Sequence, residues 1–302
     1  MNKVVLIGCG NVGMAYAFNL VTTENNVDEL VLIDINQQKA QGEALDLLHA
    51  ASCSSTKMNI KAGCYEDCNN ASIICICAGR NQEIGETRND LIKKNTAVFK
   101  DIIQNVEKTN FDGIYLIATN PVDVMTYVTY KLSGFNPNRV LGSGTTLDTA
   151  RLKYIIANVC GINPKNIHAF VMGEHGDTEF IPWSCAMVGY FDALKVISEN
   201  DRSKILYDVR NSAYDIINKK GNTAYGIGIC LANITNAILN NTNEILTISC
   251  YNAEKDVYIG TPAVINRYGV KKSLDIKFTK IEQDYFNASA DEIRSNLDKI
   301  TF

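Results

Sequence analysis

A short apolar run ends in three spaced glycines, and this junction constrains the fold of the chain more than any other feature. Val4–Ile7 has the character of a buried strand, and the glycines follow it before an amphipathic helix over Val12–Thr22. In this context the first glycine permits a tight turn, the second lets a pyrophosphate approach the helix N-terminus, and the third allows close helix–strand packing. The pattern predicts a dinucleotide site made by Gly8, Gly10, Asn11, Val12 and Gly13.

An acidic residue at the end of the second predicted strand supports this prediction. Asp34 directly follows the apolar run Leu30–Ile33. Its carboxylate can accept hydrogen bonds from the ribose hydroxyls of the adenosine half, and it would repel a 2′-phosphate. We therefore expect NAD rather than NADP. The alternative is a structural glycine turn followed by an aspartate that caps a helix.

Strands alternate with helices through the first half of the chain. This alternation predicts an α/β fold, a doubly wound parallel sheet of the Rossmann type with helices on both faces. We assign residues 1–143 to an NAD-binding domain of this kind. The predicted strands are Val4–Ile7, Leu30–Ile33, Asn59–Ala62, Ile73–Cys77, Ile114–Ala118 and Val140–Gly142, and the predicted helices are Val12–Thr22, Gln37–Ala51, Asn95–Lys108 and Val122–Leu132.

The rhythm changes in the second half, where we predict an α+β catalytic domain for the substrate over residues 144–302. No repeat or low-complexity linker separates the halves, so a tight interface is expected between them. The predicted helices are Leu147–Val159, Ser203–Lys219, Thr223–Leu239 and one that begins at Lys280, and the predicted strands are Ile167–Val171, Phe180–Val188 and a hairpin within Ile245–Val264.

Composition argues against several classes of partner. The net charge is −4 with no basic run, which disfavours nucleic acid and anionic membrane surfaces. No apolar stretch reaches the roughly 18 residues of a membrane span, and the N-terminus has no cleavable signal pattern. The 10 cysteines fall mostly in apolar runs and complete no zinc-type spacing. We therefore expect free thiols, no metal and a cytoplasmic location.

Two sequence features suggest proton chemistry. One of only 3 histidines, His175, lies between glycines in a short polar loop after an apolar run, and imidazole exchanges a proton near neutral pH. Asp148 and Arg151 are spaced to share one face of a predicted helix. An aspartate can orient a histidine through Nδ1–H, and an arginine fork suits a carboxylate. The alternatives are a structural histidine and a surface ion pair.

Four segments together resemble the signatures of the L-lactate dehydrogenases, a family whose superfamily includes the malate dehydrogenases. The resemblance extends over essentially the whole chain, from the first strand to the last helix. It implies an NAD-dependent enzyme that interconverts pyruvate and (S)-lactate. The segments are Asn81–Arg88, Thr119–Asp123, Asp148–Arg151 and Gly173–Phe180.

The resemblance also implies a role for each matching residue. His175 would protonate the pyruvate carbonyl as hydride arrives from NADH, and Asp148 would orient it. Arg151 would bind the substrate carboxylate, and Arg88 would polarise the carbonyl when its loop closes and excludes water. In this family the bond between Asn120 and Pro121 is cis. Further substrate contacts are expected from Gln82, Asn120 and Thr223, and further cofactor contacts from Gly79 and Asn120.

Substrate choice is expected to depend on Gln82. A malate dehydrogenase that resembled this chain would have arginine there, to pair with the second carboxylate of oxaloacetate, whereas a neutral glutamine suits pyruvate. Arg80 and the pair Glu83-Ile84 depart from the family pattern, and we expect Arg80 to stay outside the pocket. The alternatives are a malate or 2-hydroxyisocaproate dehydrogenase, and a catalytically silent NAD-binding sensor. The sensor would need neither His175 nor its partners.

Two cationic positions resemble an allosteric site. Bacterial members of the family bind fructose 1,6-bisphosphate between subunits through an arginine and a histidine. His168 matches the histidine, and Lys153 stands in place of the arginine, without its bidentate geometry. The resemblance therefore implies a homotetramer, or a homodimer, with this bisphosphate as effector. The alternative is that His168 is an ordinary interface residue.

Overall fold

The first half of the chain forms a parallel sheet whose strands are buried on both faces. The computed structural model describes residues 1–80 and 88–301. The strands are β1 (Lys3–Ile7), β2 (Glu29–Ile33), β3 (Asn59–Ala62), β4 (Ile73–Ile76), β5 (Ile114–Ile117) and β6 (Val140–Gly142), in the order β3-β2-β1-β4-β5-β6. Because β1 pairs in parallel with both β2 and β4, the strand order reverses beside it. The predicted doubly wound sheet is confirmed, and this reversal is the point where such sheets bind ligands.

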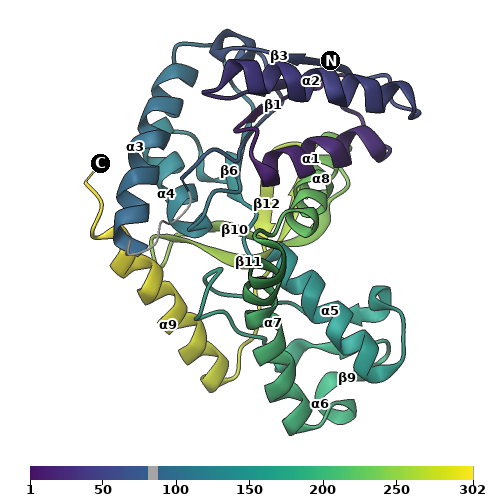
Figure 1. Cartoon of the computed structure of the whole chain (residues 1–302). Helices are drawn as coiled ribbons and strands as arrows, with labels where there is room; N and C mark the ends of the chain where they lie inside the picture. The colour runs from purple at the N-terminus through teal and green to yellow at the C-terminus, as the bar shows by residue number, and fades with distance from the viewer. Residues whose placement is uncertain (81–87, 302) are drawn as a thin grey trace.

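Helices cover both faces of this sheet (Figure 1). Alternate residues of β1 enter opposite cores: Val4 and Leu6 face one cluster, and Val5 and Ile7 face the other. Two-sided burial explains why the strand is continuously apolar. The helices of the first half are α1 (Asn11–Thr22) and α2 (Gln37–Ser52) on one face, and α3 (Arg88–Val106) and α4 (Val122–Ser133) on the other.

The second half extends the same sheet, so the two halves share a core. The strands β10 (Glu244–Asn252), β11 (Val257–Asn266) and β12 (Gly269–Ser273) continue it to nine strands, and Ser249 of β10 pairs with Gly142 of β6. Helix α8 (Tyr225–Leu239) lies against α1 so closely that a Cβ on Gly228 would come within 2.7 Å of the Ala15 backbone. The two halves therefore meet within one continuous sheet, which agrees with the tight interface expected between them.

The remaining elements form a smaller layer with its own apolar core (Figure 1). The predicted strand Phe180–Val188 shortens to its last two residues, because Phe180 forms only an isolated bridge with Met172 and Pro182 then leads into a 3-10 turn. The predicted strand Ile167–Val171 shortens to its first two residues. The elements of this layer are α5 (Thr146–Cys160), β7 (Ile167–His168), β8 (Met187–Val188), β9 (Phe191–Asp192), α6 (Ala193–Val196) and α7 (Glu199–Lys220). The last helix, α9 (Lys280–Leu297), packs against the main sheet instead.

Two further expectations concern cysteine and the membrane. All ten cysteines are free thiols, as the apolar setting of most of them predicts. In the described part of the chain, every helix is too short or too polar to cross a bilayer.

Candidate active site

The turn between β1 and α1 has the shape that its glycines predict. Gly8 has φ +103°, and a Cβ there would lie 2.4 Å from the backbone nitrogen of Ala78. A Cβ on Gly13 would lie 2.1 Å from the carbonyl oxygen of Gly8, so the helix packs directly on the turn. Gly10 has open space instead, at a helix N-terminus without a side-chain cap. Uncapped amides beside open space suit an anionic pyrophosphate.

Asp34 connects the end of β2 to this turn. Its Oδ2 accepts a hydrogen bond of 2.7 Å from the backbone N–H of Cys9, and its Oδ1 accepts one of 2.9 Å from that of Asn36. Gly79, beyond β4, lies so near Thr119 that a Cβ would come within 2.5 Å of its methyl group. The carboxyl ends of β1, β2 and β4 lie side by side, which brings Gly8, Asp34 and Gly79 to the same edge of the sheet.

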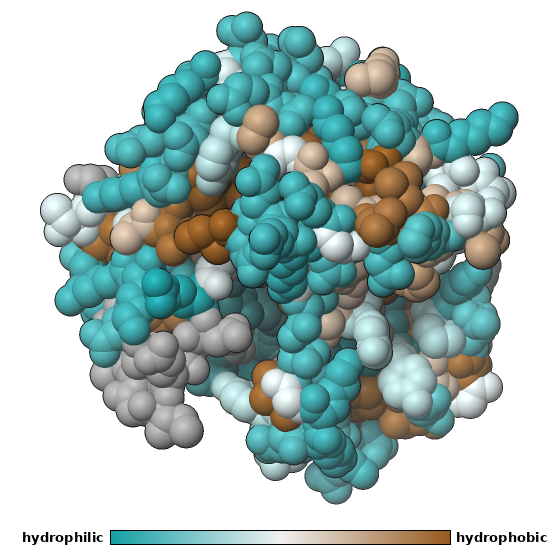
Figure 2. Space-filling view, turned by 45° about the horizontal axis from the view of Figure 1, so that its top comes forward, coloured by the Kyte–Doolittle hydropathy of each residue, from teal (hydrophilic) through white to brown (hydrophobic). Residues whose placement is uncertain are grey.

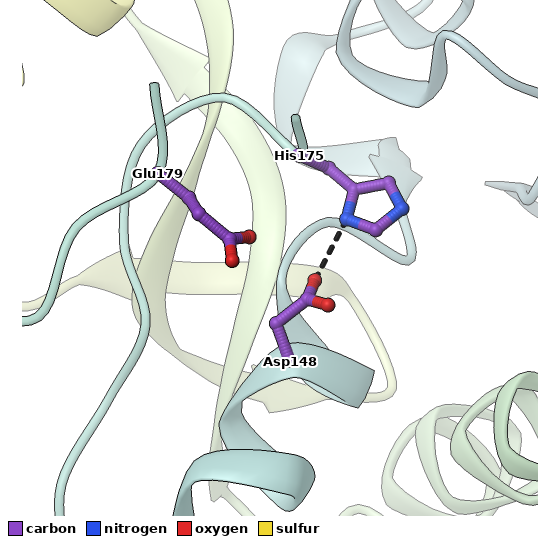
Figure 3. A group of neighbouring side chains, drawn as sticks. All are labelled: Asp148, His175 and Glu179. Atoms are coloured by element: carbon purple, nitrogen blue, oxygen red, sulfur yellow. Dashed lines mark hydrogen bonds and ion pairs between the residues drawn. The ribbon is translucent and has the colours of Figure 1, made fainter. Parts of the chain in front are cut away.

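His175 and the buried Asp148 form a histidine–aspartate pair (Figure 3). His175 Nδ1 and Asp148 Oδ2 are 2.7 Å apart, and Arg151 donates to the other oxygen of Asp148 at 2.6 Å. Burial alone would raise the pKa of Asp148, but the two cationic partners lower it below its ordinary value. Burial favours neutral His175, yet Asp148 outweighs this effect and raises the pKa of His175 to about 9. The His175 ring is therefore protonated and cationic at neutral pH, and its Nε2 is directed away from Asp148.

The backbone of the histidine loop is held by a second buried aspartate. Asp123, in the first turn of α4, accepts the His175 N–H at 2.8 Å and the Ser249 hydroxyl at 2.5 Å. Burial raises the pKa of Asp123 to about 6, although these hydrogen bonds oppose the shift. From α9, the Ser289 hydroxyl accepts the Glu174 N–H at 2.5 Å. Sequence analysis quoted Asp123 only as part of a signature and did not identify this contact.

The start of α4 brings the first half of the chain to the same site. The Asn120–Pro121 peptide is cis, as the resemblance implied. The Asn120 carbonyl accepts a hydrogen bond of 2.9 Å from Asn95, whose side-chain oxygen accepts the Arg80 N–H at 2.8 Å. The side chain of Arg80 is exposed, which agrees with its expected place outside the pocket.

The histidine–aspartate pair, Arg151 and the start of α4 line one cavity of about 360 Å³. Glu179 and Arg210 line it, although sequence analysis singled out neither, because only the fold brings α7 to the histidine loop. Thr223, which was expected there, is not among the lining residues of the described chain. The lining consists of Leu91, Asn120, Pro121, Asp148, Arg151, His175, Gly176, Asp177, Glu179, Arg210, Ala213, Tyr214 and Ile217.

Some expected residues cannot be placed against this cavity. Gln82 and the pair Glu83-Ile84 lie outside the described residues. Arg88 is the first residue of α3, and its side chain lies outside the description too.

The two candidate effector residues lie on neighbouring elements away from the cavity. His168 is exposed at the end of β7, and Lys153 is partly buried on α5. Burial lowers the pKa of Lys153, and the negative charge of Glu244 opposes that shift.

The site residues together define a class of protein. The chain has a glycine turn at a helix N-terminus, a histidine paired with a buried aspartate, and an arginine that donates to the same aspartate. A dehydrogenase that acts on small hydroxy acids requires such a set of groups. Two family models match the chain: the NAD-binding domain of lactate/malate dehydrogenase over residues 2–142 and its α/β C-terminal domain over residues 145–301. The chain belongs to the lactate/malate dehydrogenase family.

Its relatives narrow the identification within that family. An L-lactate dehydrogenase from Geobacillus sp. (strain WCH70) is 47% identical over 309 residues, which cover 99% of this chain and 97% of the relative. One from Bacillus pumilus is also 47% identical, covering 98% and 97%. Among solved structures, a lactate dehydrogenase from a Medee basin deep-sea metagenome library superposes with a TM-score of 0.96 at 46% identity, covering 100% and 99%. The ligand-bound minor L-lactate dehydrogenase of Enterococcus mundtii gives 0.96 at 38% identity and the same coverage.

Proposed function

We propose that the protein is an NAD-dependent L-lactate dehydrogenase, which interconverts pyruvate and (S)-lactate. One observation carries the proposal: a single buried carboxylate, Asp148, holds the His175 imidazole at 2.7 Å and the Arg151 guanidinium at 2.6 Å. An acid–base group and a carboxylate anchor are thereby fixed relative to each other, as reduction of a 2-oxo acid requires. The names of the relatives agree with this activity.

The residues of the chain divide the work as follows. Gly8, Gly10 and Gly13 would let the pyrophosphate of NAD reach the start of α1, and Asp34 would receive the adenosine ribose. The bound nicotinamide supplies or accepts the hydride. Residues 1–143 would thus bind the cofactor and residues 144–302 would provide most of the substrate site, although Asn120 and Pro121 line the cavity from the first half.

The proton follows from the state of His175. In the direction of reduction, Arg151 holds the substrate carboxylate and the protonated imidazole gives its Nε2 proton to the ketone oxygen. Asp148 stabilises the cationic imidazole before that step. Afterwards the remaining proton stays on Nδ1, which donates it to the Asp148 carboxylate. In the direction of oxidation, the neutral imidazole accepts the hydroxyl proton. We assign Arg88 to polarisation of the carbonyl and Gln82 to the side-chain end of the substrate.

The assembly is proposed to be a homotetramer, with a homodimer as the simpler possibility. Apolar side chains are exposed on two separate regions, and Figure 2 shows that apolar patches on the visible face are divided by polar side chains. One region lies on α1, α2 and α8 and includes Phe18, Leu45 and Ile229; the other lies on β9 and its approach and includes Tyr190 and Phe191. Two distinct self-contacting faces are what a tetramer of dihedral symmetry needs.

Fructose 1,6-bisphosphate is proposed as an effector at Lys153 and His168. A bisphosphate that binds the assembled state more tightly would favour that state. The test is a pair of pyruvate saturation curves near pH 6, with and without the bisphosphate. Coincident curves with unchanged oligomer size would remove the effector from the proposal. The ten free thiols support a reducing compartment, and we place the protein in the cytoplasm.

One assay tests the main proposal against its alternatives. Loss of NADH absorbance is followed in parallel with pyruvate, oxaloacetate and 2-oxoisocaproate, and with NADPH in place of NADH. We expect the highest kcat/KM with pyruvate and NADH. Equal or better efficiency on oxaloacetate or 2-oxoisocaproate would replace the assignment by a malate or 2-hydroxyisocaproate dehydrogenase, and comparable use of NADPH would contradict the role of Asp34.

A further inference from the structure

A third ionisable side chain, Glu179, lies against the histidine–aspartate pair. It is 3% exposed, and ligand-type atoms of Asp148, His175 and Glu179 all lie within 4.8 Å of one another. Figure 3 shows the three side chains directed toward a common space. Glu179 precedes Phe180, whose backbone pairs with Met172, so the main chain beside Glu179 is held by two hydrogen bonds.

This carboxyl group is buried without full hydrogen bonding. Within the described chain, Glu179 Oε1 has no hydrogen-bond partner, and neither does Nε of the adjacent Arg210. Arg210 donates instead to the backbone carbonyl of Glu179, and both residues line the cavity. A buried carboxyl group that only supported the fold would have its oxygens paired. Unpaired polar atoms that face a cavity are available to a ligand or to a proton.

The charges around Glu179 and its burial bring its pKa close to neutral pH. The charged groups that face it are Asp148 and Arg151 from α5, His175 from its own loop and Arg210 from α7. Burial, and then the negative charge of Asp148, raise the pKa of Glu179 to about 8 against the effect of the three cations. The group is therefore mostly neutral at neutral pH and becomes an anion in mildly alkaline solution.

The surroundings also favour a proton over a metal ion in this cluster. A divalent cation bound between these three groups would have to replace the hydrogen bond of 2.7 Å between His175 and Asp148. It would also lie beside two guanidinium groups. Protonation of Glu179 removes the same repulsion between the two carboxylates with no added charge to accommodate.

We propose that Glu179 is an electrostatic positioning residue that, in mildly alkaline solution, takes up a proton from water when an anionic substrate binds at Arg151 and releases it when the site empties. The inference rests on the proposed function, because it assumes that the substrate presents a carboxylate to Arg151. A bound carboxylate adds a negative charge to a cavity that already contains Asp148. An ionised Glu179 would oppose that anion, whereas a neutral Glu179 does not. Substrate affinity and Glu179 protonation are therefore linked, and each favours the other.

The test compares proton uptake with and without an ionisable side chain at position 179. Oxamate, an unreactive isostere of pyruvate, is titrated calorimetrically into the NADH complex at pH 8 in two buffers of different ionisation enthalpy. Wild type is expected to take up about half a proton per site more than Glu179→Gln. Asp215→Asn removes one charge from the exposed side of α7, away from the cavity lining, and should behave as wild type.

The pyruvate KM gives an independent readout. Between pH 7 and pH 9 the wild-type KM should rise more steeply than that of Glu179→Gln, by up to about tenfold per pH unit above the Glu179 titration. At pH 7 the two enzymes should differ little, since Glu179 is already neutral there. Glu179→Met, which also cannot ionise, replaces Glu179→Gln if the amide variant does not fold.

The outcomes separate this inference from the proposed function. Equal proton uptake and parallel KM profiles in an enzyme that binds oxamate and reduces pyruvate would overturn the role of Glu179 alone. Failure of wild type to bind oxamate and to reduce pyruvate would overturn both.

Discussion

The glycine turn between β1 and α1 and the acid–base site around His175 are built in different ways. The turn is made of backbone: a Cβ on Gly8 or Gly13 would collide with main-chain atoms, and Asp34 accepts two main-chain N–H groups. The acid–base site is made of side-chain charges buried together, from α4, α5 and the histidine loop. The first depends on shape and the second on electrostatics. They should therefore fail differently when altered, the first in folding and cofactor binding and the second in proton transfer.

The largest expected effect separates chemistry from cofactor binding. His175→Ala should lower kcat for pyruvate reduction by about 10²–10⁴, the usual contribution of a general acid. NADH affinity, measured by fluorescence titration, should change little, because the glycine turn and Asp34 are unchanged. His49→Ala, on the exposed surface of α2, is the matched control and should keep wild-type turnover. Near-normal kcat in a folded His175→Ala enzyme would make the histidine structural.

A substitution at the substrate end should change selectivity without changing either region. Gln82→Arg should shift the ratio of kcat/KM for oxaloacetate over pyruvate by on the order of 10²-fold, because a guanidinium can pair with a second carboxylate that otherwise stays unpaired. The measurement is the ratio of the two efficiencies in wild type and variant, with Gln82→Asn as the control for side-chain replacement. An unchanged ratio would show that residue 82 does not meet the substrate.

Two glycines test whether the turn between β1 and α1 depends on its shape. Gly13→Ala places a Cβ 2.1 Å from the Gly8 carbonyl oxygen and should lower the free energy of unfolding by about 1–3 kcal/mol. Gly10→Ala meets no atom within 4 Å, so its stability should stay within about 0.5 kcal/mol of wild type, while NADH binding weakens. Denaturant unfolding and NADH titration measure the two effects. Normal NADH affinity in Gly10→Ala would move the pyrophosphate away from this turn.

The smallest effect concerns the support of the histidine loop. Asp123→Asn leaves one of the two donors, the His175 N–H or the Ser249 hydroxyl, facing an amide NH₂. We expect kcat to fall about tenfold because the His175 loop is misplaced, which corresponds to an increase of about 1.4 kcal/mol in the activation free energy. NADH affinity should be unchanged. Ser249→Ala removes only one donor and should have a smaller effect. If Asp123→Asn retained full kcat, the loop would be positioned by other contacts.

The contrast between the two regions also explains what the sequence could predict. The glycine turn, Asp34 and the strands of the parallel sheet lie close together in sequence, and their two-sided burial leaves continuous apolar runs. The Asp148–His175 pair was anticipated from residue chemistry and from resemblance to a family, and the structure brings it together at 2.7 Å.

What could not be predicted depends on contacts between distant segments. Glu179 and Arg210 meet only because α7 crosses the histidine loop, and no spacing in the sequence signals that contact. Asp123 was visible as a signature residue, but its hydrogen bonds to His175 and Ser249 require the complete sheet. The predicted strand Phe180–Val188 was too long, since only Met187–Val188 form a strand, because its apolar composition hid the effect of Pro182.

The proposed mechanism requires that buried Asp148 keep His175 protonated, and therefore cationic, at neutral pH. The most direct measurement is an NMR titration of the His175 ring in wild type and in Asp148→Asn, using isotope-labelled histidine in a chain that has only 3. We expect a wild-type pKa of about 9, which falls to the ordinary value of 6.5 or below in the variant because burial then acts without its main opponent. A wild-type pKa near 6.5, or the same pKa in both proteins, would contradict it.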